Sequence, residues 1–161
     1  TILSVKMLNR YNAQFRLQVV GNIPEKMRYK GLNNFEKWRK LFECEAVSII
    51  GPVYSREGLG KLFTRNDIFC FPSHYATEAN PLVLIEAACN GMKIVAYDRN
   101  IFKSLLSGYS CVVYVAKALP SVIANALIEV SEMSIDREEV ELLRERYRVN
   151  YFQKDLLKLI D

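Results

Sequence analysis

The sequence is poor in the residues that mark the common alternatives to a compact globular domain. Its 161 residues include only seven glycines, five prolines and one histidine. So little glycine and proline excludes a collagen-like or low-complexity chain. No Gly-x-Gly-x-x-Gly follows an apolar run, which argues against a dinucleotide-binding dehydrogenase. With one histidine and no paired cysteines, we expect no metal site.

Long apolar runs are also missing. No run approaches the roughly 18 uncharged residues that a membrane span needs, and the first residues lack a basic-then-apolar secretion signal. The four cysteines are scattered, with no Cys-x-x-Cys spacing, so we expect reduced core thiols in a cytoplasmic protein. The formal net charge of +4 leaves open phosphorylated substrates and peripheral association with the inner face of a membrane.

Half of the residues are apolar and a quarter are charged, and the chain is long enough to form one hydrophobic core. We therefore expect a single domain over residues 1–161. Short β-branched or aromatic runs alternate with helical spacing, which is typical of an α/β fold with a parallel sheet and helices on both faces. Four of the five expected strands are apolar nearly throughout, as strands covered on both faces must be. The expected strands are residues 15–20, 46–50, 67–71, 93–97 and 111–115.

The spacing of apolar residues predicts the helices between these strands. Asp136 and Glu139 resemble a capping box that begins a last helix running toward Leu159. The mixed charges of that helix indicate a solvated face rather than a nucleic-acid surface. The expected helices are residues 2–11, 33–43, 55–64, 81–90, 100–106 as a weak piece of about one turn, 119–133, and the last one.

One stretch, residues 71–91, carries the chemistry. From Leu82 to Cys89 the expected helix is apolar around its whole circumference except at Glu86, and such a helix is normally buried. We therefore expect Glu86 in or at the edge of the core. A buried carboxylate needs a partner, which a ligand hydroxyl pair, a loop backbone or an arginine would all supply.

The start of this helix is a candidate anion site. Pro81 suits the first helical position and Asn80 before it suits the N-cap. The helix then begins at the carboxyl end of the strand at 67–71, where ligands bind in open α/β sheets and where free N–H groups favour phosphate. Leu82 and Val83 are the expected N–H donors.

These residues resemble a known family. Glu78 and Glu86, separated by seven residues, are preceded by Phe-Pro-Ser and followed by Ala-Ala-Cys-Asn-Gly-Met-Lys-Ile-Val-Ala. This pattern looks like the donor-site signature of the retaining GT-B glycosyltransferases of family 4. Residues 16–21, 48–53 and 59–70 resemble the family's second strand, its third strand and its next helix and strand, so the resemblance covers about two thirds of the chain.

The resemblance implies a function and a site. The chain would be the C-terminal, nucleotide-sugar-binding half of an enzyme that transfers a hexosyl group from a nucleotide diphosphate sugar to an acceptor glycan or lipid-linked glycan, with retention and without a metal or other cofactor. Such an enzyme would act in polysaccharide or glycoconjugate synthesis. Glu78 would stabilise an oxocarbenium-like transition state and Glu86 would hold the ribose. The remaining expected donor-site residues are Asn80, Pro81, Leu82, Val83, Gly21 and His74.

The sequence also departs from the family pattern. Members begin this domain with a strand and a basic Gly-Arg…Lys-Gly segment that grips the diphosphate, and neither is found here. We therefore expect a sheet without its first, central strand, and a chain that is inactive without an N-terminal acceptor domain. The alternative is a non-catalytic Rossmann-like binding or regulatory module whose glutamates are structural, which an ion pair between Glu86 and an arginine of this chain would favour.

Overall fold

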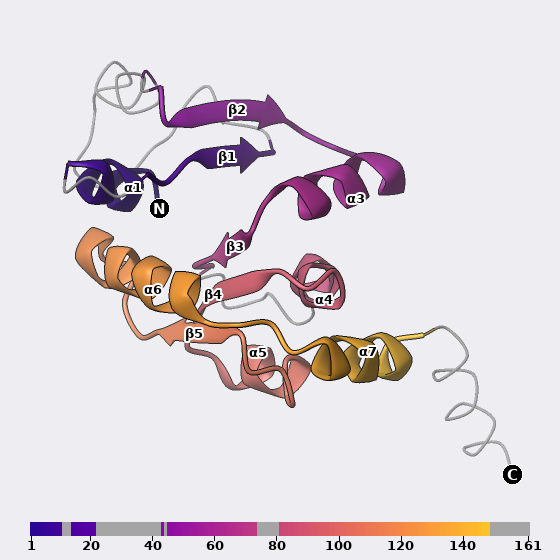
Figure 1. The fold of residues 1–161 in the computed structure, drawn as a ribbon. Coiled ribbons are helices and arrows are strands. Elements are labelled where there is room, and N and C mark those ends of the chain that lie inside the picture. Colours follow the sequence, from indigo (N-terminus) through magenta and orange to yellow (C-terminus); the bar gives the residue numbers. More distant parts are fainter. Residues whose placement is uncertain (11–13, 22–42, 44, 74–80, 149–161) are drawn as a thin grey trace, which may run out of the picture.

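From β2 to α6 the described strands and helices alternate along the chain (Figure 1). The computed structural model describes residues 1–10, 14–21, 43, 45–73 and 81–148. The strands in this part of the chain are β1 (Leu17–Val20), β2 (Val47–Gly51), β3 (Ile68–Phe71), β4 (Lys93–Tyr97) and β5 (Val112–Val115). The helices are α1 (Ile2–Asn9), α3 (Arg56–Arg65), α4 (Leu82–Cys89), α5 (Asn100–Leu105), α6 (Pro120–Glu132) and α7 (Arg137–Arg146).

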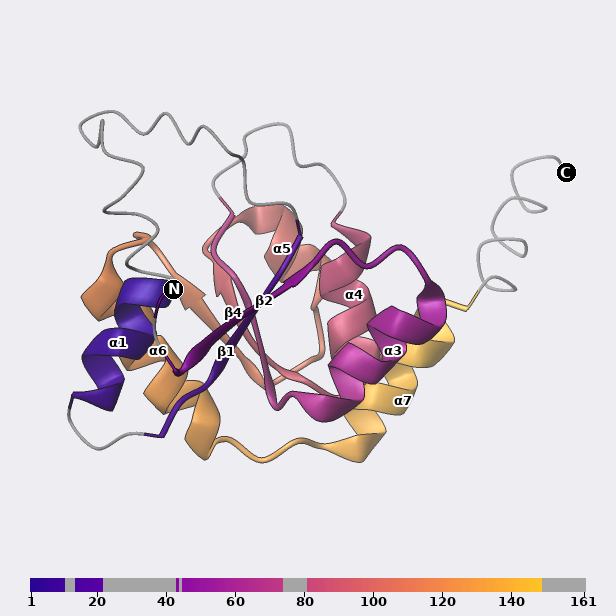
Figure 2. The same ribbon diagram turned by 90° about the horizontal axis from the view of Figure 1, so that it is seen from above.

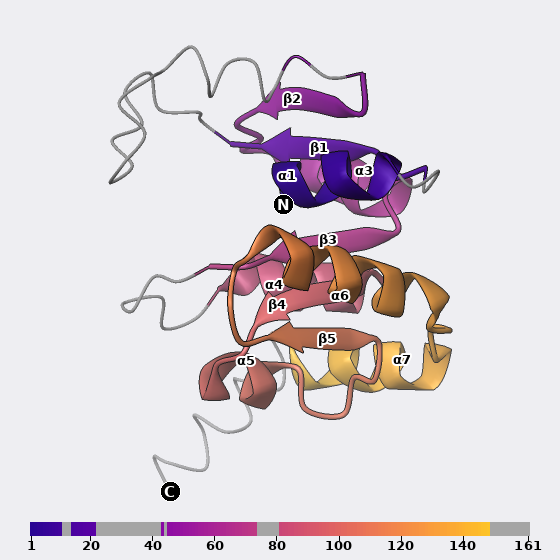
Figure 3. The same cartoon turned by 90° about the vertical axis from the view of Figure 1, so that its left-hand side faces the viewer.

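The five predicted strands are confirmed, with ends that shift by at most two residues. They form two groups in the described residues: β1 pairs with β2, and β3, β4 and β5 pair in that order. Every pair is parallel. Figure 3 shows the arrows of β1, β2, β3 and β5 pointing to the same side, so the carboxyl ends of the strands face one edge of the molecule.

The core lies on both faces of β4. Ile94, Val95 and Ala96 are each 0% exposed. Because successive strand residues point to opposite faces, Val95 joins one apolar cluster with α1 and α6, and Ile94 and Ala96 join a second with α4, α5 and α7. Figure 2 shows α1 and α6 on one side of the strands and α3, α4 and α7 on the other. The expected Rossmann-like α/β fold is therefore confirmed.

The strand at 46–50 was expected to be covered on both faces, and this is wrong. In β2 only Val47 is buried, while Ser48, Ile49 and Ile50 are exposed. Within the described residues, β2 pairs only with β1, and the helices of both apolar clusters pack on β4 and β5 instead. The helix predicted at 33–43 lies outside the described residues, apart from its last position.

The helices follow the prediction with two differences. Asp136 caps α7 as expected, because its Oδ1 accepts a 2.8 Å hydrogen bond from the backbone N–H of Glu138. Glu139 does not complete a capping box: its Oε2 accepts from the backbone N–H and the hydroxyl of Ser110. The last helix ends at Arg146 rather than running on to Leu159, and residues 149–161 lie outside the described part.

Candidate functional site

The candidate site is built around the start of α4. β3 ends at Phe71, and α4 begins at Leu82, one residue later than predicted, so that Pro81 is the N-cap. Pro81 is buried, and its carbonyl accepts a 2.9 Å hydrogen bond from the Leu84 N–H. The N–H groups of Leu82 and Val83 have no acceptor within the helix, as at any helix start. This first turn therefore keeps the donors that an anion would use.

One face of α4 holds the helix in the core. Leu84, Ile85, Ala87 and Ala88 are buried. Leu84 and Ala88 contact the cluster beneath β4, and Ala87 packs with Phe63 of α3. At the other end, Gly91 ends the helix with a φ of 72°, a conformation that glycine adopts without strain. The axis and rotation of α4 are thus fixed by its neighbours on both sides.

The other face of α4 is open, and the expectation that Glu86 is buried is wrong. Glu86 is exposed, and Leu82, one turn earlier on the same side of the helix, is 63% exposed. The helix is apolar nearly all round, yet only part of its circumference meets the core. An exposed carboxylate needs no partner, so burial gives no reason to place a ligand on Glu86.

The structure also bears on the alternative role of Glu86. Within the described residues, Glu86 makes no ion pair; the bridges there join other acidic residues to lysine or arginine. The observation that would favour a structural glutamate is therefore lacking in this part of the chain. Glu86 lies on the exposed face of α4, one turn after the first N–H groups of the helix.

Gly21 lies where the sequence places it, directly after β1. Its φ is 122° and its N–H donates a 2.9 Å hydrogen bond to the Gly51 carbonyl at the end of β2. Gly51 has a φ of 78°. The two glycines therefore join the carboxyl ends of neighbouring strands, and the Gly21 N–H is already paired. A ligand could approach the backbone of Gly21 closely, because no atom lies within 4 Å of where a Cβ would be.

A charged group after β4 was missed from the sequence. Asp98 forms a 2.6 Å ion pair with Lys103 of α5, and Arg99 stacks 5.3 Å from the centre of the Phe102 ring. Burial, with a smaller effect of the Asp98 charge, raises the pKa of the nearby Tyr114 to about 12. The available signal was Asp-Arg at the end of an apolar strand, at the edge where ligands bind in parallel sheets.

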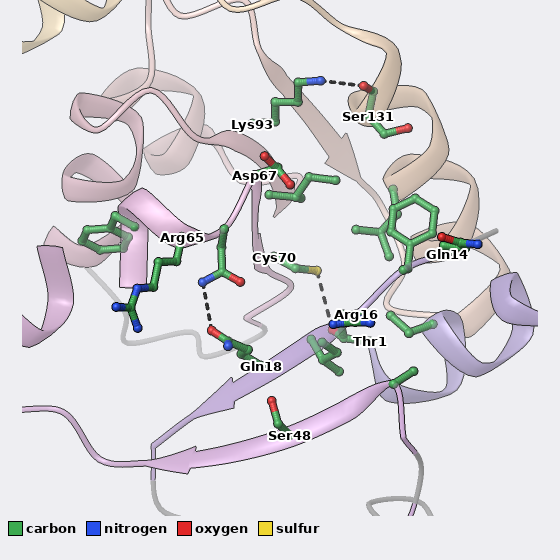
Figure 4. Close-up of a pocket in the computed structure, with 18 of the residues that line it drawn as sticks. Thr1, Gln14, Arg16, Gln18, Ser48, Arg65, Asp67, Cys70, Lys93 and Ser131 are labelled. Atoms are coloured by element: carbon green, nitrogen blue, oxygen red, sulfur yellow. Dashed lines mark hydrogen bonds between the residues drawn. The ribbon is translucent and has the colours of Figure 1, made fainter. Parts of the chain in front are cut away.

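The predicted residues fall into two sets. Pro81, Leu82, Val83 and Glu86 come together on α4, and Gly21 lies at the same carboxyl edge of the strands (Figure 3). Glu78, Asn80 and His74 lie outside the described residues. None of the described set lines the cleft that opens between β1 and β3 (Figure 4).

In the described part of the chain, no group of three or more His, Cys, Asp or Glu side chains gathers as metal ligands would. No helix in these ranges is long and apolar enough to cross a membrane. Of the four cysteines, Cys70, Cys89 and Cys111 are free thiols.

Comparison with known proteins identifies the class of enzyme. A family profile described as "Glycosyl transferases group 1" matches residues 1–146. Because this range spans most of the 161 residues, the chain belongs to that family. Its chemistry is the transfer of a glycosyl group from a donor to an acceptor. No curated protein matches the chain significantly.

Proposed function

We propose that this chain is the donor-binding domain of a retaining glycosyltransferase of the GT-B type, family 4, and that its donor is a nucleotide diphosphate sugar. Membership of the group 1 glycosyl transferases supplies the reaction class. The observation that carries the donor site is the start of α4, which places free N–H groups and an exposed carboxylate on one open face at the carboxyl edge of the strands.

The geometry of α4 suits a diphosphate followed by a ribose. The N–H groups of Leu82 and Val83 and the positive end of the helix dipole favour the diphosphate. Glu86 follows Leu82 by four residues, or about 6 Å along the axis at about 1.5 Å per residue. A carboxylate at that distance can accept hydrogen bonds from both ribose hydroxyls. Because Glu86 is exposed before the donor arrives, it loses water only when those bonds form.

The remaining roles rest on the sequence resemblance. Glu78 would lie beside the donor sugar, where a negative charge stabilises the positive charge that develops at the anomeric carbon. Asn80 would add a backbone donor to the diphosphate, and His74 would contact the donor or the acceptor. Gly21 would allow a close approach of the donor to the end of β1, which agrees with the open space around its Cα.

The proposal extends to the setting of the reaction. The acceptor would be a glycan or a lipid-linked glycan bound by a separate N-terminal domain, so the isolated chain would bind its donor without turnover. The process would be polysaccharide or glycoconjugate synthesis, in the cytoplasm or at the inner face of a membrane. The reaction would need no metal.

Isothermal titration with UDP- and GDP-sugars tests the donor site. We expect one of the two nucleotide classes to bind the wild-type chain, and Glu86→Ala to weaken binding by about tenfold to a hundredfold, the effect of losing hydrogen bonds to a charged group. Glu129→Ala is the matched control, because Glu129 is also an exposed glutamate on a helix, α6. Absence of binding to the wild type, or equal loss in both variants, would contradict the proposal.

A further inference from the structure

Three cationic side chains follow the last two strands of the described sheet. Arg99 directly precedes α5 and Lys103 lies within it, after β4, whereas Lys117 follows β5. Asp98 is the acidic residue next to them, and residues 99–128 contain no Asp or Glu at all. The three cations, defined here as the cationic patch, therefore outnumber the carboxylate of this stretch and make it positively charged.

The fold brings the two segments together. The N–H of Asp98 donates a 2.9 Å hydrogen bond to the Val115 carbonyl, which joins the carboxyl end of β4 to that of β5. The Lys103 Nζ lies 2.6 Å from Oδ1 of Asp98 and 5.6 Å from the centre of the Tyr114 ring in β5. In Figure 3, α5 and the connection from β5 to α6 lie at the end to which the arrow of β5 points. Lys117 is therefore at the same edge as Lys103.

The cations are held so that they can meet a ligand. The Arg99 guanidinium lies 5.3 Å from the centre of the Phe102 ring, which is itself 5.7 Å from the ring of Phe71 at the end of β3. Stacking on a ring leaves the N–H groups of a guanidinium in their plane, where they suit phosphate. The ion pair of Lys103 is on the surface, where such pairs are weak and exchange readily with other anions. Lys117 is exposed and forms no ion pair within the described residues.

Exposed apolar side chains accompany the cationic patch. Ile101, between Arg99 and Lys103, is 37% exposed, and Leu119, two residues after Lys117, is 53% exposed. A small hydrophilic anion would use the cations alone. A ligand with a phosphate at one end and an aliphatic chain beyond it would also cover the apolar side chains, which is favourable in water. The patch therefore fits an amphiphilic anion better than a simple one.

We propose that the cationic patch binds the phosphate or diphosphate of a lipid-linked acceptor, and that Ile101 and Leu119 contact the first part of its aliphatic chain. The proposal rests on the proposed function, because it chooses the lipid-linked class from the two classes of acceptor given there. The separate N-terminal domain would bind the rest of the acceptor.

The place of the patch separates this phosphate from the donor. The diphosphate of the donor is proposed at the start of α4, which follows β3. β5 lies two strands away from β3, or about 10 Å at about 4.8 Å per strand. The patch therefore lies to one side of the donor diphosphate, at the same carboxyl edge, so that both substrates can be bound at once.

Isothermal titration of the chain with farnesyl diphosphate, below the concentration at which it forms micelles, tests the proposal. Inorganic pyrophosphate supplies the anion without the aliphatic chain, and vesicles of phosphatidylglycerol supply an anionic lipid surface. The variants are Lys103→Ala, Lys117→Ala and Leu119→Ala. Lys61→Ala is the matched control for the lysines, because Lys61 is also an exposed, ion-paired lysine on a helix. Leu142→Ala is the control for Leu119, since Leu142 is 62% exposed.

We expect farnesyl diphosphate to bind about tenfold more tightly than inorganic pyrophosphate. Lys103→Ala, Lys117→Ala and Leu119→Ala should each weaken its binding by about threefold to tenfold, the effect of losing one hydrogen bond or one apolar contact. The two control variants should bind as the wild type does. Lys117→Ala should keep the affinity for the UDP- or GDP-sugar, whereas Glu86→Ala should lower only that affinity, so the acceptor patch and the donor site can fail separately.

Three results would overturn the proposal. Equal affinity for farnesyl diphosphate and inorganic pyrophosphate would make the patch an anion site without a lipid. Binding to phosphatidylglycerol vesicles but not to farnesyl diphosphate would make it a contact with the membrane surface. A loss of nucleotide-sugar binding in Lys117→Ala equal to its loss of farnesyl diphosphate binding would assign the patch to the donor instead.

Discussion

Several polar side chains donate hydrogen bonds to backbone carbonyls at turns and helix ends. The hydroxyl of Tyr109 donates a 2.7 Å hydrogen bond to the Met92 carbonyl, which joins the entrance of β5 to that of β4. Arg144 reaches the Cys89 carbonyl at the end of α4, and Tyr147 reaches the Leu105 carbonyl at the end of α5. These bonds satisfy main-chain groups that helix ends and turns leave without partners.

Tyr109 gives a pH-dependent prediction. Burial of the ring, with smaller contributions from nearby acidic groups, raises the pKa of Tyr109 above its usual value. The unfolded chain then loses this proton from about pH 10 upward while the folded chain keeps it, so the contribution to stability is complete below pH 10 and falls as pH rises. We expect Tyr109→Phe to cost about 1–3 kcal/mol at pH 7 and to reduce the fall above pH 10.

Urea unfolding at several pH values between 7 and 11 measures this effect. Tyr54→Phe is the control for removing a phenol, since Tyr54 is 86% exposed. An unchanged slope in Tyr109→Phe above pH 10 would show that its ionisation is not linked to folding.

At the scale of elements, helix starts depend on single capping residues. Asp136 lies in an extended conformation before α7 and accepts the Glu138 N–H, as Ser55 accepts the Gly58 N–H before α3. We expect Asp136→Ala to reduce the free energy of unfolding by about 1 kcal/mol, and Asp136→Asn, which keeps an acceptor oxygen, to cost less than half as much. Chemical denaturation of the two variants compares them directly. Equal losses would assign the effect to the charge of Asp136 rather than to its hydrogen bond.

The helices and strands also show how much of the fold can be predicted from the sequence. The limits of β4 were predicted correctly, because a fully apolar run between Lys93 and Tyr97 fits only a strand covered on both faces. The exposure of Glu86 was not predictable from α4 alone. A helix that is apolar nearly all round does not reveal which side its neighbours leave uncovered, and here that side includes Leu82. The partner of Glu139 is Ser110, almost thirty positions away along the chain, so local capping rules could not find it.

For the candidate site too, one part could be predicted from the sequence and another part could not. The start of α4 was predicted to within one residue, because Pro81 is a strong local signal. The bond between Gly21 and Gly51 depends on the pairing of β1 with β2, which is a long-range contact. Local sequence therefore placed the residues on their elements, whereas the hydrogen bond of Gly21 and the exposure of Glu86 depend on how those elements meet.

At the scale of the whole molecule, the two groups of strands differ in how firmly they are held. Among the described residues, β4 pairs with a strand on each side and packs against two apolar clusters. There, β1 pairs only with β2, and its other edge faces the cleft. Leu17 of β1 and the neighbouring Phe15 and Ala46 pack against the cluster that α1 forms with α6. Stability should therefore be unevenly distributed between the groups.

Native-state hydrogen exchange at low urea concentrations measures that distribution. We expect the amides of β1 and β2 to exchange through an opening that costs at least about 2 kcal/mol less than the opening that exposes β4, since regions with fewer buried contacts open first. Val5→Ala removes part of the apolar contact between α1 and the α6 cluster. It should lower the opening energy of β1 and β2 more than that of β4. Val113→Ala in β5, on the same face of the sheet, is the matched control and should lower the opening energy of β4. Identical opening energies for β1 and β4 in the wild type would mean that the two groups of strands unfold as one unit despite the cleft between them.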